Sequence, residues 1–487
     1  MNNKKKGLFI LFTILLGFSF ATFAQTKSSK RGVAFNNLTE QELELLSPGV
    51  SWAYNWGASV NNVANLGNNG IDYIPMIWGS NNISNSITTA RNYLTAHPEI
   101  KYILGFNEPN LSDQANMSPQ FAAQLWTTYL QPLAQEFNLK IVGPAVNYSA
   151  TYDPFQWYDD FFAACPDCQV DFVAVHLYMT SASSIQSNLA QFKKWGKPIW
   201  FTEFCVLDNT TTVSAQSQFM VQTLDYLETD PDIFRYSWFK ADGGSSSWSL
   251  FDNTGALTPI GEIYTHMSSY DSTYYFTTDQ QIPATQYIRM NRANMEKTTD
   301  ESGYIDLYGM TPLSWMDYNV DIPEDGEYNI FFRSCPSFAT TNSTAFVSVN
   351  GVTIATMPFV NQGLNNWDTQ SCTGAFSKGK QTIRVGFTQG GLKLNWFAIT
   401  QSSTAPTGIE SAATDDVKAY PNPVSDILNL QVPANTQVTL YSICGNSVYS
   451  GKSPNAINMS AFPQGIYILD MRFENGGRKV EKIIKEK

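Results

Sequence analysis

From residue 31 to residue 270, short apolar runs alternate with longer segments whose apolar positions recur every three or four residues. The runs predict strands buried on both faces, and the segments between them predict amphipathic helices. The predicted strands are Arg31–Phe35, Val50–Trp56, Asp72–Trp78, Tyr102–Asn107, Lys140–Val146, Asp171–Tyr178, Ile199–Cys205 and Phe234–Phe239. The predicted helices include Glu40–Leu46, Ile87–Ala96, Gln120–Phe137 and Ala215–Leu227.

Eight strands with helices between them are typical of a (β/α)₈ TIM barrel, which we assign to residues 30–270. Gly and Pro stand at many of the joints, as in Gly143-Pro144. An open, doubly wound sheet is the alternative fold. The sequence contains no Gly-rich phosphate loop that would favour this alternative.

The pattern changes in residues 281–401, where short alternating runs are separated by turn signals and helical periodicity is scarce. Asn350-Gly351 between two such runs predicts a β-hairpin, and the region as a whole predicts a β-sandwich. Residues 402–414 are rich in Ser, Thr and Ala and read as a linker. Residues 415–487 then form a third, small β-rich domain.

The first residues have the pattern of a secretory signal. Three lysines at positions 4–6 precede an apolar run, and small residues at 21–24 offer a cleavage site before Gln25. We therefore assign residues 1–24 to a signal peptide. A retained membrane anchor is the alternative, but the apolar run is short for a membrane span.

Composition narrows the possible partners. Hydrophobic residues make up 43% of the chain and charged residues 15%, which allows a large core. Aromatic residues reach 14%, which suits stacking on sugar rings but equally suits large cores. The net charge of −12 argues against nucleic acid or an anionic membrane as a partner. We expect a monomer.

Cys165 and Cys168 form a C-x-x-C pair. A redox pair of this kind opens a helix after a strand, whereas this one precedes a predicted strand, so a structural role in a loop is favoured. Export would permit a disulfide. A zinc site needs further ligands, and the chain has only three histidines, so we predict no metal site.

Two glutamates carry the candidate chemistry. Glu108 and Glu203 stand at the C-terminal ends of the predicted fourth and seventh strands, the end at which TIM barrels place their active sites. Retaining glycoside hydrolysis needs two carboxyl groups roughly 5–5.5 Å apart, one as acid and base and one as nucleophile. A structural ion pair is the alternative role for either residue taken alone.

Other side chains at strand ends are candidates for contact with a sugar. Asn107 precedes Glu108, while His176 and Tyr178 alternate along one strand and could orient Glu203 or contact sugar. Aromatic residues alternate along the second strand, and others end the third and eighth strands, where each could equally belong to the core. The predicted substrate-binding set is Asn107, His176, Tyr178, Tyr54, Asn55, Trp78 and Trp238.

Several motifs in residues 30–270 resemble glycoside hydrolase family 128 of clan A, a family of retaining β-1,3-glucanases. They are Leu104–Pro109, Trp200–Phe204, Trp52–Trp56, Pro75–Gly79, Cys165–Phe172 and Val175–Tyr178. The resemblance implies that Glu108 is the acid/base, Glu203 the nucleophile and Cys165–Cys168 a disulfide. It also implies a β-glucan substrate and no cofactor, and we expect endo action. Leu177 departs from the family pattern, which often has Trp there.

Residues 281–401 resemble a carbohydrate-binding module of family 6 in the motifs Gly303–Asp306, Trp315–Tyr318, Gly326–Tyr328 and Leu394–Phe397. That resemblance implies that Tyr304, Trp367 and Asn395 bind sugar. The acidic residues that bind calcium in the family are replaced around Asn291, which puts a structural calcium ion in doubt.

Residues 415–487 resemble the type A sorting domain of the type IX secretion system of Bacteroidetes. The markers are Tyr420–Pro423, Leu428–Leu430 and Pro463–Leu469. The resemblance implies that secretion machinery is a partner and that the protein is secreted or held at the cell surface. An ordinary β-domain is the alternative.

Two alternative functions stay open at this stage. One is a clan A hydrolase that cuts a β-1,4-glycan, and the other is a non-catalytic glycan-binding surface protein. Substrate profiling separates the first from a β-1,3-glucanase. The presence of both glutamates argues against the second.

Overall fold

The computed structural model describes residues 27–61, 63–148, 152–338, 342–402, 417–442, 447–473 and 478–486. The expected signal peptide, Cys444 and nearly all of the expected linker lie outside these residues. The described residues divide at Ser402 into two compact units. The first unit contains the barrel and the sandwich, and the second contains the C-terminal domain.

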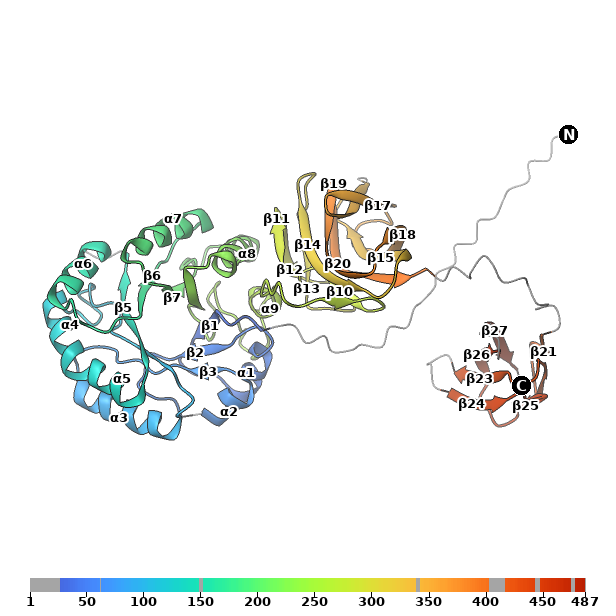
Figure 1. Cartoon of the computed structure of the whole chain (residues 1–487), viewed down its shortest axis with the longest axis horizontal. Helices are drawn as coiled ribbons and strands as arrows, with labels where there is room; N and C mark the ends of the chain where they lie inside the picture. Colours follow the sequence, from blue (N-terminus) through green and yellow to red (C-terminus); the bar gives the residue numbers. More distant parts are fainter. Residues whose placement is uncertain are drawn as a thin grey trace. The chain divides into compact units, whose positions relative to one another are not determined.

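The barrel is built from eight parallel strands with helices on the outside (Figure 1). The strands are β1 (Arg31–Ala34), β2 (Trp52–Tyr54), β3 (Asp72–Tyr73), β4 (Tyr102–Leu104), β5 (Lys140–Asn147), β6 (Phe172–His176), β7 (Ile199–Phe204) and β8 (Ile233–Trp238). The helices are α1 (Glu40–Leu46), α2 (Val63–Asn68), α3 (Ile83–Ala96), α4 (Pro119–Leu125), α5 (Gln131–Phe137), α6 (Pro154–Ala164), α7 (Ala182–Phe192), α8 (Val213–Thr229) and α9 (Pro259–His266).

The strand order is β3-β2-β1-β8-β7-β6-β5-β4, and a parallel bridge between Met76 and Leu104 joins the two ends of this sheet. The prediction of a (β/α)₈ barrel is therefore confirmed. Side chains alternate between its interior and the helical layer, as the period of a strand requires. Trp52, Tyr54 and Trp200 belong to the interior cluster, whereas Val33 and Ala53 pack with the residues of the helices.

Two predicted elements differ from the structure for local reasons. The third strand was expected over Asp72–Trp78, but only Asp72 and Tyr73 form ladder pairs, because Pro75 has no N–H to donate. The predicted helix Gln120–Phe137 is interrupted by a π-helical turn at Trp126–Leu130 between α4 and α5. Pro132 in the first turn of α5 cannot donate a backbone hydrogen bond to that turn, which accounts for the interruption.

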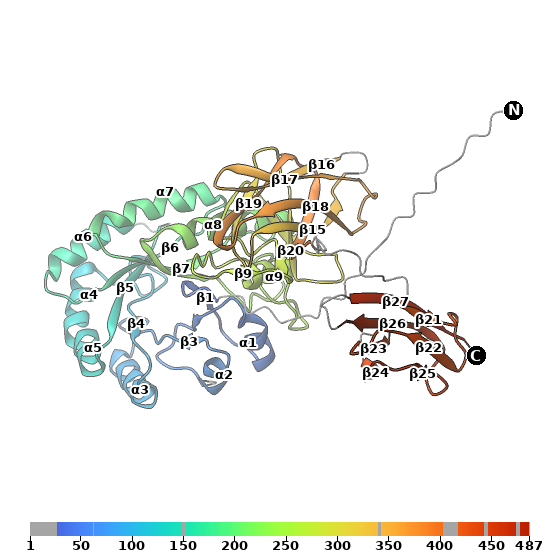
Figure 2. The ribbon, with the colours of Figure 1, turned by 45° about the vertical axis from the view of Figure 1, so that its right-hand side comes forward.

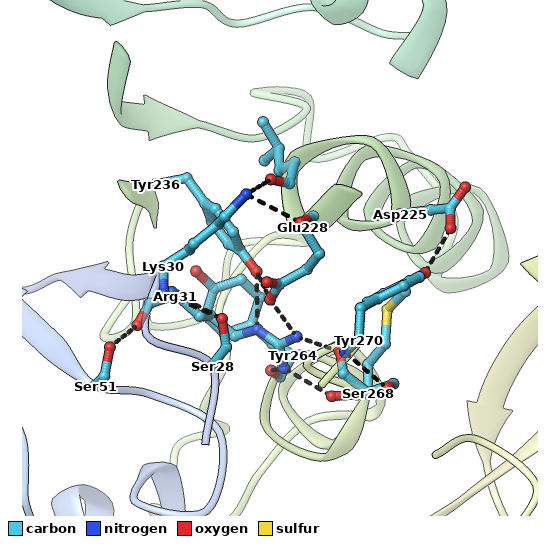
Figure 3. A network of polar contacts seen from close by, with 12 residues as sticks. Ser28, Lys30, Arg31, Ser51, Asp225, Glu228, Tyr236, Tyr264, Ser268 and Tyr270 are labelled. Carbon is cyan, nitrogen blue, oxygen red and sulfur yellow. Dashed lines mark hydrogen bonds and ion pairs between the residues drawn. The ribbon is translucent and has the colours of Figure 1, made fainter. Parts of the chain in front are cut away.

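Arg31 ties the N-terminal end of β1 to the last two barrel helices (Figure 3). Its guanidinium is fully buried and lies 2.9 Å from the buried carboxylate of Glu228, which also accepts a hydrogen bond from Tyr236. The remaining guanidinium hydrogens go to the phenol oxygen of Tyr236 and to the carbonyl oxygens of Tyr264, Met267 and Ser268. The buried charge is thus paired and fully hydrogen-bonded, and it holds the chain where the barrel ends.

The second domain is a sandwich of two mostly antiparallel sheets (Figure 1, Figure 2). One sheet has the order β12-β13-β20-β15-β18 with β10 beside β20, and the other has β11-β14-β19-β16-β17 with β9 beside β14. These strands are β9 (Phe276–Thr277), β10 (Gln281–Pro283), β11 (Arg289–Asn291), β12 (Asn294–Lys297), β13 (Ile305–Tyr308), β14 (Trp315–Ile322), β15 (Gly326–Pro336), β16 (Ser343–Val349), β17 (Val352–Phe359), β18 (Asp368–Phe376), β19 (Gly379–Gln389) and β20 (Leu392–Gln401).

The predicted hairpin at Asn350-Gly351 joins β16 to β17. Both residues have positive φ angles, 50° and 78°, as the tight turn requires.

Asp306 in β13 is a buried carboxyl group inside the sandwich. Burial raises its pKa to about 7, and the nearby Thr298 hydroxyl opposes this effect. The folded module therefore holds this proton more tightly than the unfolded chain. The associated stability is present below the unfolded pKa and is lost as the pH rises through 7. We expect Asp306→Asn to raise the unfolding free energy of the module at pH 8.5 by on the order of a few kcal/mol. Its melting temperature at that pH should rise accordingly.

Calorimetry of the parent protein and the Asp306→Asn variant at pH 4 and pH 8.5 measures the gain in stability. That gain should be small at pH 4. Glu324→Gln removes an exposed carboxylate from the same module and should show no such gain. An equal effect of Asp306→Asn at both pH values would contradict a buried titrating carboxyl group.

The C-terminal domain has its own core and two sheets, β21-β22-β25 and β24-β23-β26-β27. Its β26 and β27 run side by side in Figure 2. The strands are β21 (Lys418–Tyr420), β22 (Ile427–Gln431), β23 (Gln437–Ser442), β24 (Ser447–Lys452), β25 (Ala456–Asn458), β26 (Gly465–Arg472) and β27 (Arg478–Lys485). Within the described parts of the chain, no helix has the length and apolar character needed to span a membrane.

Candidate active site

The two glutamates are brought together at one end of the barrel by backbone bonds between neighbouring strands. Glu108 follows β4, where its N–H donates to the carbonyl oxygen of Ala145 at 2.7 Å and its φ is 46°. Glu203 lies near the end of β7, directly beside His176 of β6 in the strand register. A non-glycine residue with positive φ is strained, and the strand contacts around Glu108 hold it in this conformation.

Glu203 is surrounded by hydrogen-bond donors. The indole N–H of Trp56 donates to its Oε1 at 2.8 Å, and the phenol of Tyr54 donates to the same oxygen at 3.1 Å. The phenol of Tyr178 donates to Oε2. Burial, and then the charge of Glu203, raise the pKa of both phenols well above 10, so both remain protonated donors. Three donors around one carboxyl group stabilise its ionised form.

Glu108 has a different environment. Its Oε1 accepts a hydrogen bond from the side-chain amide of Asn147 at 2.7 Å and lies 2.8 Å from Nδ1 of His176. Asn110 accepts a hydrogen bond from the backbone N–H of Asn147 and so positions that residue. Burial opposes ionisation of Glu108, but the hydrogen bond and charge of His176 outweigh it and lower the pKa of Glu108.

His176 lies between the two carboxyl groups, with Nδ1 also 3.3 Å from Oε2 of Glu203. Its side chain is fully buried, which alone would lower its pKa, but the charges of Glu203 and Glu108 raise the pKa above the usual 6.5. Burial raises the pKa of Glu203, with a further rise from Glu108, against the effect of His176 and the donors. We assign the hydrogen on Nδ1 from these partners, because both neighbours are acceptors.

The same three residues are the natural place to test for a metal ion. Glu108, His176 and Glu203 each offer one ligand atom, and these atoms lie within 4.8 Å of one another. However, Nδ1 of His176 is at hydrogen-bond distance from a carboxylate oxygen, and the oxygens of Glu203 already accept hydrogen bonds from Trp56 and Tyr178. The arrangement fits a hydrogen-bonded acid pair better than an open set of metal ligands.

The other predicted substrate-binding residues occupy different positions. Trp78 is half-buried, and its carbonyl oxygen accepts a hydrogen bond from the backbone N–H of Asn107, so these two residues adjoin Glu108. Asn55 supports the loop after β2, since its side-chain oxygen accepts from the Tyr73 phenol and from the Gly57 N–H.

The expectation that Trp238 contacts sugar is wrong. Its side chain is 0% exposed, its indole N–H donates to the carbonyl oxygen of Trp248, and its ring packs on Phe204 and Tyr264. The last residue of β8 therefore faces the helical layer rather than the barrel interior.

Two residues that contact the glutamates were absent from the predicted set, namely Trp56 and Asn147. Trp56 continues the alternation of Trp52 and Tyr54, and this signal places it on the same face as Tyr54. Its φ of 60°, which aims the indole at Glu203, has no signature in the sequence. Asn147 ends β5, and only the strand register places it beside Glu108.

The predicted sugar-binding residues of the module gather around the loop from Thr298 to Tyr304. The indole N–H of Trp367 donates to the Thr299 hydroxyl at 3.1 Å, and the Asn395 amide donates to the carbonyl oxygen of Ser302 at 2.6 Å. On the barrel, Cys165 and Cys168 are joined in a disulfide in the loop before β6.

Comparison with known proteins finds three families along the chain. The family model of the glycosyl hydrolase catalytic core matches residues 32–264, that of the family 6 carbohydrate-binding module matches 283–401, and that of the secretion system C-terminal sorting domain matches 418–486. Alkali-sensitive linkage protein 1 of Schizosaccharomyces pombe is 29% identical over 250 residues, which are 49% of this chain and 44% of that protein. The chain thus spans less than half the length of this curated relative.

Two solved structures resemble the barrel more closely in sequence. A GH128 subgroup II endo-β-1,3-glucanase from Pseudomonas viridiflava is 38% identical, over 50% of this chain and 98% of that chain, with a TM-score of 0.45. A second subgroup II endo-β-1,3-glucanase, from Sorangium cellulosum, is 33% identical over 49% and 98% of the two chains, with a TM-score of 0.45. Because the sequence identity extends over nearly the whole of both relatives, the chain belongs to glycoside hydrolase family 128, and it also carries a family 6 carbohydrate-binding module and a secretion sorting domain.

Proposed function

We propose that this protein is a retaining endo-β-1,3-glucanase that is exported to the cell surface or beyond. The observation that carries the mechanism is the separation of the two carboxyl groups. One oxygen of Glu108 and one of Glu203 lie within 4.8 Å of each other. Retaining enzymes hold their carboxyl groups about 5–5.5 Å apart, whereas inverting enzymes need about 6.5–9.5 Å to admit a water.

Glu203 is the nucleophile in this proposal. The donors Tyr54, Trp56 and Tyr178 favour its carboxylate form, and the last two also fix its orientation for attack on the anomeric carbon. Attack forms a covalent glycosyl ester on Glu203 while the glycosidic oxygen leaves with a proton from Glu108. Glu108 then removes a proton from water, which attacks the anomeric carbon and releases Glu203.

The proton that Glu108 gives to the leaving glycosidic oxygen is held jointly by His176 and Glu108. Before substrate binds, His176 lowers the pKa of Glu108, so a protonated Glu108 requires that the proton move from Nδ1 across the 2.8 Å contact. The raised pKa of His176 favours the protonated imidazole, which can supply that proton. The two groups therefore titrate together rather than as separate residues.

The remaining domains support polymer binding and export. A module that binds the same polysaccharide raises the effective concentration of substrate at the barrel. The sorting domain supports passage through the secretion system, with the secretion machinery as a transient partner.

Product analysis tests the proposal. The purified mature protein would be incubated with linear β-1,3-glucan, branched β-1,3/1,6-glucan, cellulose, mannan and xylan. We expect oligosaccharides of several lengths from the β-1,3-glucans alone, with the β configuration in the first product seen by NMR. Products from a β-1,4 polymer only would overturn the substrate, and an absence of products from every glycan would favour a non-catalytic binding protein.

Trp56→Phe should isolate the contribution of the indole hydrogen bond to Glu203. The substitution keeps an aromatic ring beside Tyr54 and Phe239 but removes the N–H. A hydrogen bond to a charged group contributes about 1.5–3 kcal/mol, so kcat/KM should fall about 10-fold to 100-fold. In the parent enzyme this hydrogen bond lowers the pKa of Glu203. Its loss should raise that pKa and move the acidic limb of the pH profile to higher pH.

Trp195→Phe is the matched control, because it removes an indole hydrogen bond to Asp159 on the outside of the barrel. This control should leave kcat/KM and the pH profile unchanged. A Trp56→Phe enzyme with the parent profile would show that the indole does not act on Glu203.

A further inference from the structure

A barrel side chain and a module side chain form a face-to-face stack. The imidazole of His266, at the end of α9, lies parallel to the ring of Tyr304, with 3.8 Å between ring centroids and 6° between planes. His266 is 8% exposed, whereas Tyr304 remains 61% exposed. The barrel therefore covers one face of this tyrosine and leaves most of the residue open to solvent.

The backbone around His266 is held by contacts from both the barrel and the module. Arg31 donates to the carbonyl oxygens of Tyr264 and Met267. The side-chain amide of Gln286, a residue of the module, donates to the carbonyl oxygen of His266 at 2.8 Å. Glu262, one turn earlier on α9, forms an ion pair of 2.9 Å with Lys297 of β12. The other oxygen of Glu262 lies 3.5 Å from Nε2 of His266, so the imidazole ring is restrained as well as the backbone that carries it.

The stack involves a neutral imidazole. Burial, and then the charge of Arg31, lower the pKa of His266 to about 4. Above that pH, the ring packs as an uncharged aromatic surface against the tyrosine.

Tyr304 ends the loop around which the predicted sugar-binding residues of the module gather. Thr299 of this loop accepts from Trp367, and Ser302 and Asp300 accept from Asn395. The orientation of Tyr304 relative to Trp367 and Asn395 therefore depends on contacts from both domains.

We propose that His266, although a residue of the catalytic barrel, is a positioning residue for the glycan site of the module. By packing on one face of Tyr304, it presents the opposite face to a sugar ring of the β-glucan. This inference rests on the proposed function of the module as a β-glucan binder. It predicts that the module reaches its full affinity only when it is docked on the barrel.

Binding, rather than turnover, is the appropriate readout, because the two sites lie at opposite ends of the barrel. His266 is held by Arg31 at the N-terminal end of β1, while Glu108 and Glu203 lie at the C-terminal ends of β4 and β7. The two sites therefore take different stretches of polysaccharide.

The test measures depletion isotherms on insoluble β-1,3-glucan with the full mature chain carrying Glu203→Gln, which keeps the polymer intact. His266→Leu keeps an apolar side chain of similar size but removes the aromatic ring, and should weaken binding about 3-fold to 10-fold. His266→Phe restores a ring and should bind as the parent does. Lys297→Ala breaks the ion pair of the same interface but keeps both stacked rings and the contact of Glu262 with His266, and should also bind as the parent does.

Tyr304→Ala separates failure of this inference from failure of the proposed function. The melting temperature of each variant checks that it is folded. Loss of affinity in Tyr304→Ala but not in His266→Leu would overturn the positioning role while keeping the glycan site. Equal losses in Lys297→Ala and His266→Leu would overturn it in favour of general domain docking. Parent affinity in Tyr304→Ala would show that the glycan site lies elsewhere and would reject both the site and the inference.

Discussion

Glu203→Gln should lower kcat on β-1,3-glucan by about 10⁴-fold or more while leaving affinity for the polymer unchanged. The amide keeps the shape of the side chain but cannot form the glycosyl ester. Its NH₂ group would take the place of one carboxylate oxygen and would face either the Trp56 or the Tyr178 donor, from which it cannot accept a hydrogen bond. Reducing-end assays and polymer-binding isotherms measure the two quantities on the same preparation.

The stereochemistry of chemical rescue makes the assignment sharper. In Glu203→Ala, azide can enter the vacated space and attack the anomeric carbon directly, which should yield the α-glycosyl azide from an activated β-glycoside. Glu136→Gln, which changes an exposed glutamate paired with Arg91, is the matched control and should keep parent activity. Residual activity of Glu203→Gln above about one hundredth of the parent would count against its role as nucleophile.

Glu108→Gln should also reduce hydrolysis of β-1,3-glucan by about 10³-fold or more, but for a different reason. Its amide cannot donate a proton to the leaving glycosidic oxygen, nor activate the water of the second step. A substrate with an acidic phenol as leaving group needs no proton in the first step. The covalent intermediate should therefore form rapidly on that substrate and accumulate, which a burst of released phenol would reveal.

Azide distinguishes the two roles. With Glu108→Ala, it should attack the intermediate on Glu203 and give the β-glycosyl azide, the opposite configuration to that from Glu203→Ala. The Glu108→Ala variant should also lose the basic limb of the pH profile, because the proton of the His176–Glu108 pair sets that limb. An α-glycosyl azide from the Glu108 variant would reverse the two assignments.

The architecture was largely readable from the pattern of the chain. Continuous apolar runs separated by helical periodicity specify strands buried on both faces, and a closed parallel barrel is the arrangement that buries eight of them. The ends of such strands must meet at one edge, so the sequence alone places Glu108 and Glu203 close together. The Asn-Gly turn between β16 and β17 followed from its positive φ angles, which are a local property of those two residues.

Side-chain direction at the strand ends was not readable in the same way. Trp238 and Trp56 both stand at the ends of predicted strands, yet one is enclosed beside α9 and the other reaches Glu203. A shift of one residue in the register reverses the face, and the register of β7 and β8 shifts between Phe201 and Phe204. The left-handed backbone conformations of Trp56 and Glu108 likewise have no signature in the residues next to them.

Contacts between domains are the features that local sequence predicts least well. Tyr304 could be recognised as a sugar-binding candidate from its own motif, but nothing near it in the chain indicates that His266 packs on its ring. The chain determines strands, helices, turns and the chemical identity of the acid pair, because these depend on neighbours in sequence. The contacts of His176 with both glutamates and the stack on Tyr304 exist only in the folded chain. Each depends on residues that are distant in sequence and meet only when the strands and domains pack.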